Sequence, residues 1–386
     1  MIKVIKISIL RELGANNLNS DKSGEVKQMI INNTVVRRIA SQCLERGIKE
    51  SFREENLDND YIASCNTRYA AEFIINEIIT KKKESDEENI KKIKETVDTV
   101  MKNVFYAKKS SKKDDDVATG KNAIKFSKMD LYNLSKMMEE LIYSGVSKND
   151  CVDFVKKNFK DCVSIEDAFN GKMNTNDYIR NVDSCIHCAH ARGIYPFIRQ
   201  SDTFTALDDL ASFIGKEIGS AIIDEKSFDS GTTLFQTMAI DLDQLKRNLK
   251  LNNDKKFEEM FVKDNILYSY LEECIMSFPK NAQHSYLCAP RPALISIELL
   301  NTKRFNTDDN AFNDLKRDDA LSDISNGIKK YVDFLNAADR QYELAGERFF
   351  FTFPTAEYRP NNCTVYENFK ELLSDICSKT DDCFKE

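Results

Sequence analysis

Tryptophan is absent from the sequence, and among its 386 residues only 12 are glycine, 6 are proline and 3 are histidine. This scarcity argues against an all-β fold with many tight turns, because such turns depend on glycine and proline. Glycine-rich phosphate loops and the GxSxG motif of serine hydrolases are also missing. No serine, cysteine or threonine has a convincing neighbouring base. The sequence therefore predicts a protein that is not an enzyme.

Long apolar runs are missing as well. The segment FIINEIIT (73–80) is interrupted by Asn76 and Glu77, so no membrane span is expected. The first residues, MIKVIKISILRELG, lack the apolar core and small-residue cleavage site of a signal peptide. Eleven cysteines, an odd number, are scattered from Cys43 to Cys383. Free thiols in a reducing cytoplasm fit this pattern best, so we predict a cytoplasmic protein with no membrane partner.

The charge is unevenly distributed. The whole chain carries −7, which counts against a non-specific nucleic-acid binder. Residues 1–53, however, hold ten Lys or Arg against five Asp or Glu, a local charge of +5, which leaves −12 for the remainder. This asymmetry marks the N-terminal region as the candidate polyanion-binding face. A solvated basic stretch is the alternative interpretation.

Hydrophobic periodicity predicts strands near both chain ends and helices in the middle, an α+β organisation. Residues 2–10 alternate as a strand with one wet face. A helix is expected from about Ser41, with Leu44 and Ile48 facing inward. A β-rich arm is expected over 194–240. The other expected helices are 61–83, 87–105, 128–144, 147–158, 175–191, 241–249, 256–277, 321–344 and 365–378, and the other strands are near 292–300 and 347–353.

One cluster could hold a metal, the segment Cys185-Ile186-His187-Cys188-Ala189-His190. On the helix predicted over 175–191, the two cysteines and the two histidines would project on nearly opposite sides. A single tetrahedral ion could not gather both pairs, so we predict no metal site and no cofactor. A metal- or thiol-dependent enzyme that uses this cluster remains the alternative function.

Several short motifs occur in a particular order along most of the chain. They are Asn17-Leu18-Asn19, Arg38-Ile39-Ala40-Ser41-Gln42-Cys43-Leu44-Glu45-Arg46, Gly171-Lys172-Met173, Ala189-His190-Ala191, Phe204-Thr205-Ala206-Leu207-Asp208-Asp209-Leu210, Phe228-Asp229-Ser230-Gly231, Ile240-Asp241-Leu242-Asp243-Gln244-Leu245 and Gln283-His284-Ser285-Tyr286. Their order and spacing resemble the CasC-type backbone subunit of Cascade, the type I-E CRISPR surveillance complex, which belongs to the RAMP superfamily.

The resemblance implies a hand-shaped α+β fold. An RRM-like, ferredoxin-like palm would comprise residues 1–58, 182–194 and 241–386. Residues 59–181 would form a large helical insertion, the fingers, and residues 195–240 a β-hairpin arm, the thumb. Copies of such a subunit form a helical filament along CRISPR RNA beside other Cascade subunits. Each thumb kinks the RNA, which is then displayed for pairing with target DNA in antiviral defence.

The resemblance also implies a set of RNA-binding residues. Basic and polar groups near the N-terminus would bind phosphates, apolar groups would wedge against bases, and a late segment would add polar contacts. The predicted residues are Asn19, Lys27, Arg38, Ser41, Gln42, Arg46, Lys49, Met173, Phe204, Ile218, Gln283 and His284. Phe204 could instead be a core aromatic, and Ile223 is an alternative to Ile218 at the thumb tip.

Some expected cations are missing. Ser20 stands where the family usually has Arg, and Glu45 where it has Lys. Asn32-Asn33 replace a Gly-Gly turn, and Ala282 and His284 replace basic residues. We therefore expect the phosphate contacts of this chain to be shifted toward Arg37, Lys22 or Lys280.

Overall fold

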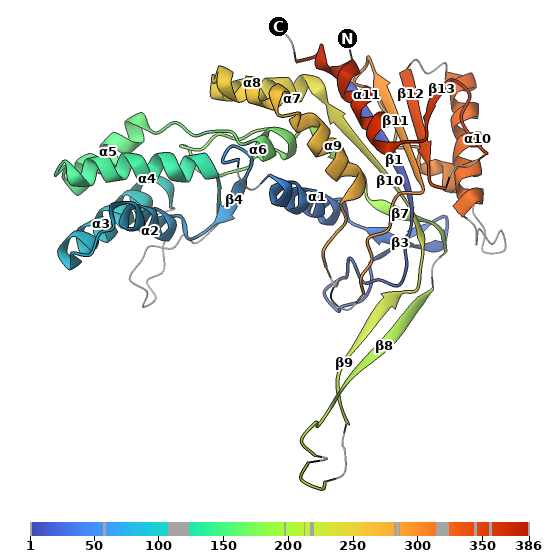
Figure 1. Ribbon diagram of the computed structural model, residues 1–386, viewed down its shortest axis with the longest axis horizontal. Helices are drawn as coiled ribbons and strands as arrows, with labels where there is room; N and C mark the ends of the chain where they lie inside the picture. The colour runs from blue at the N-terminus through green and yellow to red at the C-terminus, as the bar shows by residue number, and fades with distance from the viewer. Residues whose placement is uncertain are drawn as a thin grey trace. The chain divides into compact units, whose positions relative to one another are not determined.

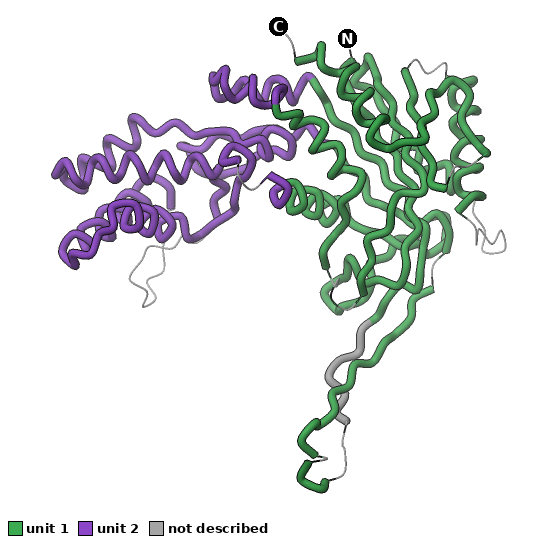
Figure 2. Tube along the Cα trace, in the orientation of Figure 1, with its two compact units in different colours: residues 1–52, 187–242, 264–386 green, residues 53–186, 243–263 purple. Residues whose placement is uncertain are grey.

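The computed structural model divides the chain into two compact units (Figure 2). Unit 1 contains residues 1–52, 187–242 and 264–386, and unit 2 contains residues 53–186 and 243–263. The described residues are 2–56, 59–106, 123–196, 198–211, 213–216, 220–281, 284, 286–313, 324–342, 346–354 and 357–384, with the backbone alone described for 220–226.

A nine-stranded mixed sheet forms the body of unit 1 (Figure 1). Its strands are β1 (Val4–Glu12), β2 (Gln28–Ile31), β3 (Thr34–Ile39), β6 (Ile186–Cys188), β7 (Ala191–Pro196), β10 (Thr233–Asp241), β11 (Leu294–Leu300), β12 (Gly346–Thr352) and β13 (Cys363–Tyr366). They follow the order β13-β12-β11-β1-β10-β7-β3-β2, and β6 pairs with β10. Strands from both chain ends meet in one sheet, so the predicted α+β class is confirmed.

The central strand β1 is buried on both faces. It pairs antiparallel with β10 and with β11, and Ile5, Ile7 and Ile9 are buried as expected. The wet face predicted for this strand is wrong, because Lys6 and Ser8 are buried too. Lys6 forms ion pairs there with Asp308 and with Glu298, the latter at 3.3 Å. A lysine in an alternating pattern was mistaken for a solvent-facing position.

Four helices of unit 1 cover the sheet. Helix α10 (Ile324–Tyr342) packs on the apolar side chains of β1, β10, β11 and β12, and α11 (Phe369–Asp381) packs on β12 and β13. Helix α1 (Ser41–Glu55) begins where predicted and buries Leu44 and Ile48. Its Phe52 meets Tyr270 of α9 (Ile266–Met276) edge-on, with ring centroids 5.0 Å apart.

The single helix predicted over 256–277 is in fact two, α8 (Lys255–Lys263) and α9. Asn265 separates them with a left-handed φ of 50°. Asparagine tolerates this conformation better than most residues, so it can end one helix and start another. The apolar periodicity continues across the break, which is why the sequence indicated one helix.

A two-stranded hairpin leaves the sheet and extends away from the body of unit 1 (Figure 1). It consists of β8 (Arg199–Leu207) and β9 (Ser220–Asp229), paired antiparallel with a register shift at Phe204/Thr205. The predicted β-hairpin arm is therefore present. It is shorter than the range 195–240, since β10 lies within the sheet between β1 and β7.

Unit 2 is mainly helical, as predicted. It contains α2 (Ala70–Lys82), α3 (Glu87–Val100) with a π-helical turn over Met101–Phe105, α4 (Lys128–Tyr143), α5 (Lys148–Asn158), α6 (Ile165–Asn170), most of α7 (Leu242–Leu249), and α8. The expected start signal Ser127 forms a capping box with Asp130. A small antiparallel pair, β4 (Ser64–Thr67) with β5 (Ile124–Ser127), was not predicted.

The helix predicted over 175–191 is wrong. Turns and loops lead instead into β6 and β7, and the backbone N–H of Ala189 donates to the carbonyl of Thr237 in the sheet, at 3.0 Å. Four consecutive residues, 191–194, are buried. A fully buried strand shows no alternation, so its short apolar run could not be distinguished from a helical segment.

Because residues 175–191 are not helical, the cysteines and histidines of the cluster Cys185–His190 do not project from opposite sides of a helix. Among the described residues, no group of three or more His, Cys, Asp or Glu side chains has an arrangement suited to a metal ion. Among all the residues that the structure describes, no helix is both long enough and apolar enough to cross a membrane.

Candidate nucleic-acid interface

Arg37 is the buried centre of the N-terminal region of unit 1. Its Nη1 donates to the carbonyls of Lys27 at 2.7 Å, Arg38 at 2.9 Å and Asn19 at 3.3 Å. Its side chain has no exposed surface. The expectation that Arg37 binds phosphate is therefore wrong. It acts as a scaffold that fixes the loop from which Lys27 emerges and the strand that presents Arg38.

Lys27 and Arg38 form a cationic surface beside His190. The backbone N–H of Arg38 donates to the carbonyl of Lys27 at 3.0 Å, which fixes the two residues side by side. Burial lowers the pKa of His190, and the positive charges of Arg38 and Lys27 lower it further. Arg38 is half-buried, and its Nε has no hydrogen-bond partner within the described part of the chain. An anion here would meet two cations, one with an unused donor.

The start of α1 borders this surface. The backbone N–H of Ser41 donates to Nδ1 of His190 at 2.8 Å, and Oδ1 of Asn19 accepts the backbone N–H of Ala40 at 3.0 Å. Those two donors are therefore already used inside the protein. Gln42, the next residue, is exposed. His190 must be neutral to accept this bond, which agrees with the lowered pKa.

A groove of about 430 Å³ follows the next turns of α1. Gly47 allows the helix to approach the chain closely here, since a Cβ at this position would lie 3.0 Å from the carbonyl carbon of Phe278. Arg46 is exposed and pairs with Glu50 at 2.7 Å. The residues that line the groove are Leu18, Asn19, Ser20, Cys43, Arg46, Gly47, Glu50, Pro279, Lys280 and Asn281.

The thiol of Cys43 connects the groove with the cationic surface. Burial raises the pKa of this thiol, while the positive charges of Lys27, Arg37 and Arg46 oppose the rise. All three cations are therefore close enough to Cys43 to affect its thiol. The groove also contains Ser20, where a family cation is missing, and Lys280, which we expected as a replacement. The structure thus places Lys280 on the same groove as Asn19 and Arg46.

Lys49 lies farther along α1, close to Glu45. Burial raises the pKa of Glu45, and the charge of Lys49 partly offsets this effect. Glu45 in turn acts on the thiol of Cys188, whose pKa is raised to about 12 by burial first and by Glu45 second. Glu45 thus lies in a half-buried polar environment and not on an open phosphate-binding surface.

The predicted base-contacting residues are in different elements. Met173 belongs to unit 2 and is 85% exposed. Phe204 is half-buried on β8 of unit 1. His284 is exposed. Ile218, Gln283 and the side chain of Ile223 lie outside the described residues.

Sequence reasoning missed two features of these elements. It did not assign His190 to the start of α1, although Ala189-His190-Ala191 was among the recognised motifs. It also overlooked the buried surroundings of Lys172, which precedes Met173 in another of the motifs.

The sequence matches the model of the CT1975-like protein family over residues 5–375. The chain belongs to this family. A search among curated proteins finds no match. Similar solved structures include a chain of a "CRISPR RNA-guided surveillance complex, pre-nicking", with a TM-score of 0.76 and 15% identity over 97% of this chain and 99% of the other. A chain of a "CRISPR RNA-guided surveillance complex" has a TM-score of 0.68 and 14% identity, with the same two coverages.

At such low identity, the likeness to the solved chains shows the fold. The expected α+β fold, with a helical part and a β-hairpin arm, is thus confirmed for this CT1975-like chain.

Proposed function

We propose that this chain is a non-catalytic backbone subunit of a CRISPR surveillance complex of the type I-E kind. Several copies would stack along a CRISPR RNA, kink it with their hairpin arms and display it for pairing with target DNA. Other subunits of the complex would be further partners. The protein would contact mainly the phosphate backbone, and base pairing would read the sequence.

The observation that carries the proposal is the cationic surface of Lys27 and Arg38 beside the neutral His190 and the start of α1. It lies on a fold shared with chains of RNA-guided surveillance complexes. The chain has a net charge of −7, yet Lys27 and Arg38 lie together and the buried Nε of Arg38 has no hydrogen-bond partner among the described residues. An RNA phosphate would neutralise these two cations and accept a hydrogen bond from this donor.

Apolar side chains at two places support the kinking role. Leu207, Leu210, Phe213 and Ile214, at the end of the hairpin arm, are all more than half exposed, and Met173 in unit 2 is more exposed still. Water-exposed apolar groups of this size favour contact with another surface, and the faces of unstacked bases are one.

The alternative, a thiol-dependent enzyme, gains no support from the geometry. Cys185 is buried, and burial raises the pKa of Cys188 to about 12, which keeps its thiol protonated at neutral pH. A nucleophilic cysteine needs the opposite environment.

The test is to express the chain together with a CRISPR transcript and its processing enzyme, purify the chain, and analyse bound RNA and metal. We expect RNA of uniform length and no stoichiometric zinc. RNA-free protein that carries one zinc per chain and loses it in the C185S/C188S variant would contradict the proposal and favour the enzyme.

A further inference from the structure

Met173 combines high exposure with unusually fixed neighbours. Its side chain is 85% exposed, whereas the side chain of Lys172, the preceding residue, has no exposed surface. An exposed apolar side chain on a loop ordinarily moves with that loop. Here the backbone is held on both sides of Met173.

On the N-terminal side, Lys172 forms a bridge with Val182. The N–H of Lys172 donates to the carbonyl of Val182 at 2.9 Å, and the reverse bond is 2.8 Å long. Gly171 has a φ of +77°, and a Cβ there would lie 2.8 Å from the carbonyl oxygen of Val182, so no other residue fits. Lys125 adds a bond from its Nζ to the carbonyl of Gly171 at 2.7 Å.

On the C-terminal side, Asn174 is attached to β5. Its Oδ1 accepts the backbone N–H of Lys125 at 2.8 Å, and its Nδ2 donates to the carbonyl of the same residue at 3.0 Å. Its own backbone N–H donates to Oδ1 of Asn181 at 2.6 Å. The amide of Asn174 therefore imitates one step of strand pairing at the edge of β5.

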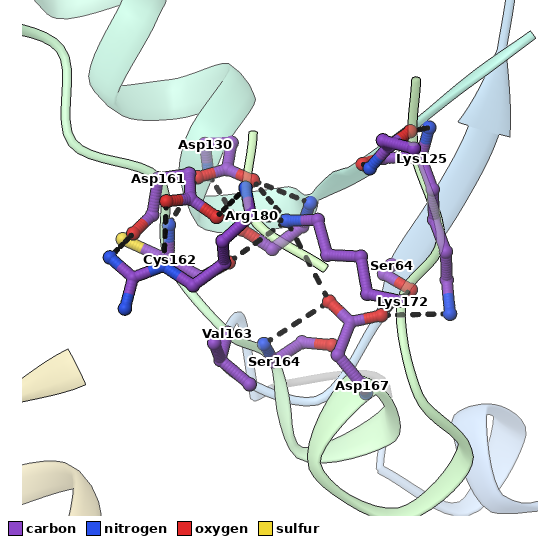
Figure 3. A network of polar contacts seen from close by, with 12 residues as sticks. Ser64, Lys125, Asp130, Asp161, Cys162, Val163, Ser164, Asp167, Lys172 and Arg180 are labelled. Atoms are coloured by element: carbon purple, nitrogen blue, oxygen red, sulfur yellow. Dashed lines mark hydrogen bonds and ion pairs between the residues drawn. The ribbon is translucent and has the colours of Figure 1, made fainter. Parts of the chain in front are cut away.

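Beneath the loop, Lys172 reaches into a buried cluster of charges (Figure 3). Its Nζ lies 3.0 Å from Asp130 Oδ2, 3.7 Å from Asp161 Oδ2 and 4.0 Å from Asp167 Oδ2, and it donates to the carbonyl of Cys162 at 3.1 Å. Lys125 also pairs with Asp167, at 2.8 Å, and Arg180 with Asp161, at 2.8 Å.

Two of these carboxylates also cap helices. Asp130 completes the capping box of α4 and Asp167 that of α6, so Lys172 connects the starts of both helices. A buried ion cluster is a poor source of stability, since well-packed apolar side chains often do as well. What such a cluster does provide is a fixed geometry for the residues attached to it.

We propose that the Lys172 cluster and the Asn174 amide form a mount that fixes Met173 for contact with a nucleobase of the bound RNA. Lys172 and Asn174 are then positioning residues, and Met173 is the contact. This inference rests on the proposed RNA-binding function. Because the backbone of Met173 is fixed before RNA arrives, little ordering is left to oppose the contact.

The test uses the full chain assembled on guide RNAs that carry 2-aminopurine at one position at a time, because this base fluoresces more strongly when it is unstacked. We expect wild-type protein to produce bright positions and M173A to dim them at least threefold. N174A, which leaves the charge cluster intact, should dim the same positions about twofold or more. K172M should do the same, and K172R should restore most of the signal.

Three outcomes would contradict the mount, the base contact or the proposed function, and the experiment distinguishes them. If M173A dims the bright positions while folded N174A leaves them as bright as in the wild type, the mount is wrong although the base contact stands. Because N174A does not disturb the buried charges, this comparison holds even if K172M fails to fold. Bright positions that M173A leaves unchanged would overturn the contact and with it the mount. If wild-type protein assembles on no RNA at all, it is the proposed function that fails.

Discussion

Nε of Arg37 lies 3.4 Å from Oδ2 of Asp229, and neither side chain has any exposed surface. Arg37 is on β3, and Asp229 is the last residue of β9, at the root of the hairpin arm. The other oxygen of Asp229 accepts bonds from the N–H of Gly231 at 3.1 Å and the hydroxyl of Thr232 at 2.9 Å. One buried ion pair therefore joins the root of the arm to β3, the strand that presents Arg38.

Breaking this pair should destabilise unit 1 strongly. In D229A the guanidinium of Arg37 would remain buried without its counter-charge, and we expect a loss of about 3–5 kcal/mol in the free energy of unfolding. Urea titration followed by circular dichroism measures this loss.

The matched control is E25Q, which removes the exposed partner of Arg199 on the same arm and should cost less than about 1 kcal/mol. Equal effects of the two variants would show that the buried pair has no special role.

The adjacent arginines show where sequence reasoning reaches its limit. Arg37 and Arg38 occupy successive positions of β3, at an irregularity in its pairing with β7, and Arg37 is fully buried while Arg38 is half-buried. The buried partner of Arg37 is the distant residue Asp229, which no local pattern reveals. The phosphate contact expected of Arg38 stays a prediction, while the one expected of Arg37 is wrong because its side chain is buried.

Helices with their own local signals were predictable, as Ser127 shows for α4. The segment 175–191 carried no such signal, and its last part pairs with β10 through β6, which begins at Ile186. The mount of Met173 was also beyond the sequence, because the carboxylates around Lys172 come from two separate parts of the chain, Asp130 from one and Asp161 and Asp167 from the other.

The charge-reversal variant R38E/K49E should lose loading onto guide RNA while it remains folded. Each reversal removes an attraction to phosphate and adds a repulsion, so we expect affinity to fall at least about tenfold near physiological salt. Arg38 should account for most of this loss, because Lys49 already faces Glu45.

Filter binding measures the affinity of R38E/K49E, and thermal melting verifies the fold. The control is K91E, a reversal at an exposed lysine of α3 in unit 2, for which we expect nearly unchanged affinity. A folded R38E/K49E protein that binds like the wild type would place the RNA surface elsewhere.

Binding should depend on salt and hardly on base sequence. If phosphate contacts dominate, the logarithm of the association constant falls linearly with the logarithm of salt concentration, with a slope of about −0.7 per neutralised phosphate for single strands. Titrations with two unrelated RNAs of equal length should give parallel lines. A tenfold preference for one RNA, or a slope near zero, would contradict phosphate-dominated binding.

His190 should make the stability of unit 1 sensitive to mild acid. Its Nδ1 accepts the backbone N–H of Ser41, which requires the neutral ring, and burial together with Arg38 and Lys27 lowers its pKa below the ordinary value of about 6.5. Between the lowered pKa and 6.5 the unfolded state binds more protons than the folded state. The stabilisation is therefore complete above pH 6.5 and is lost progressively as the pH falls toward the lowered pKa.

The comparison variant is H190N, whose Oδ1 can accept the same bond without titrating. We expect the wild-type melting temperature to fall more steeply than that of H190N between pH 7.5 and 5.5. Bound RNA should reduce this difference in slope, because phosphates beside Arg38 and Lys27 offset the charges that help keep His190 neutral. Identical pH profiles for the two proteins would show that the cap formed by His190 does not contribute to folding.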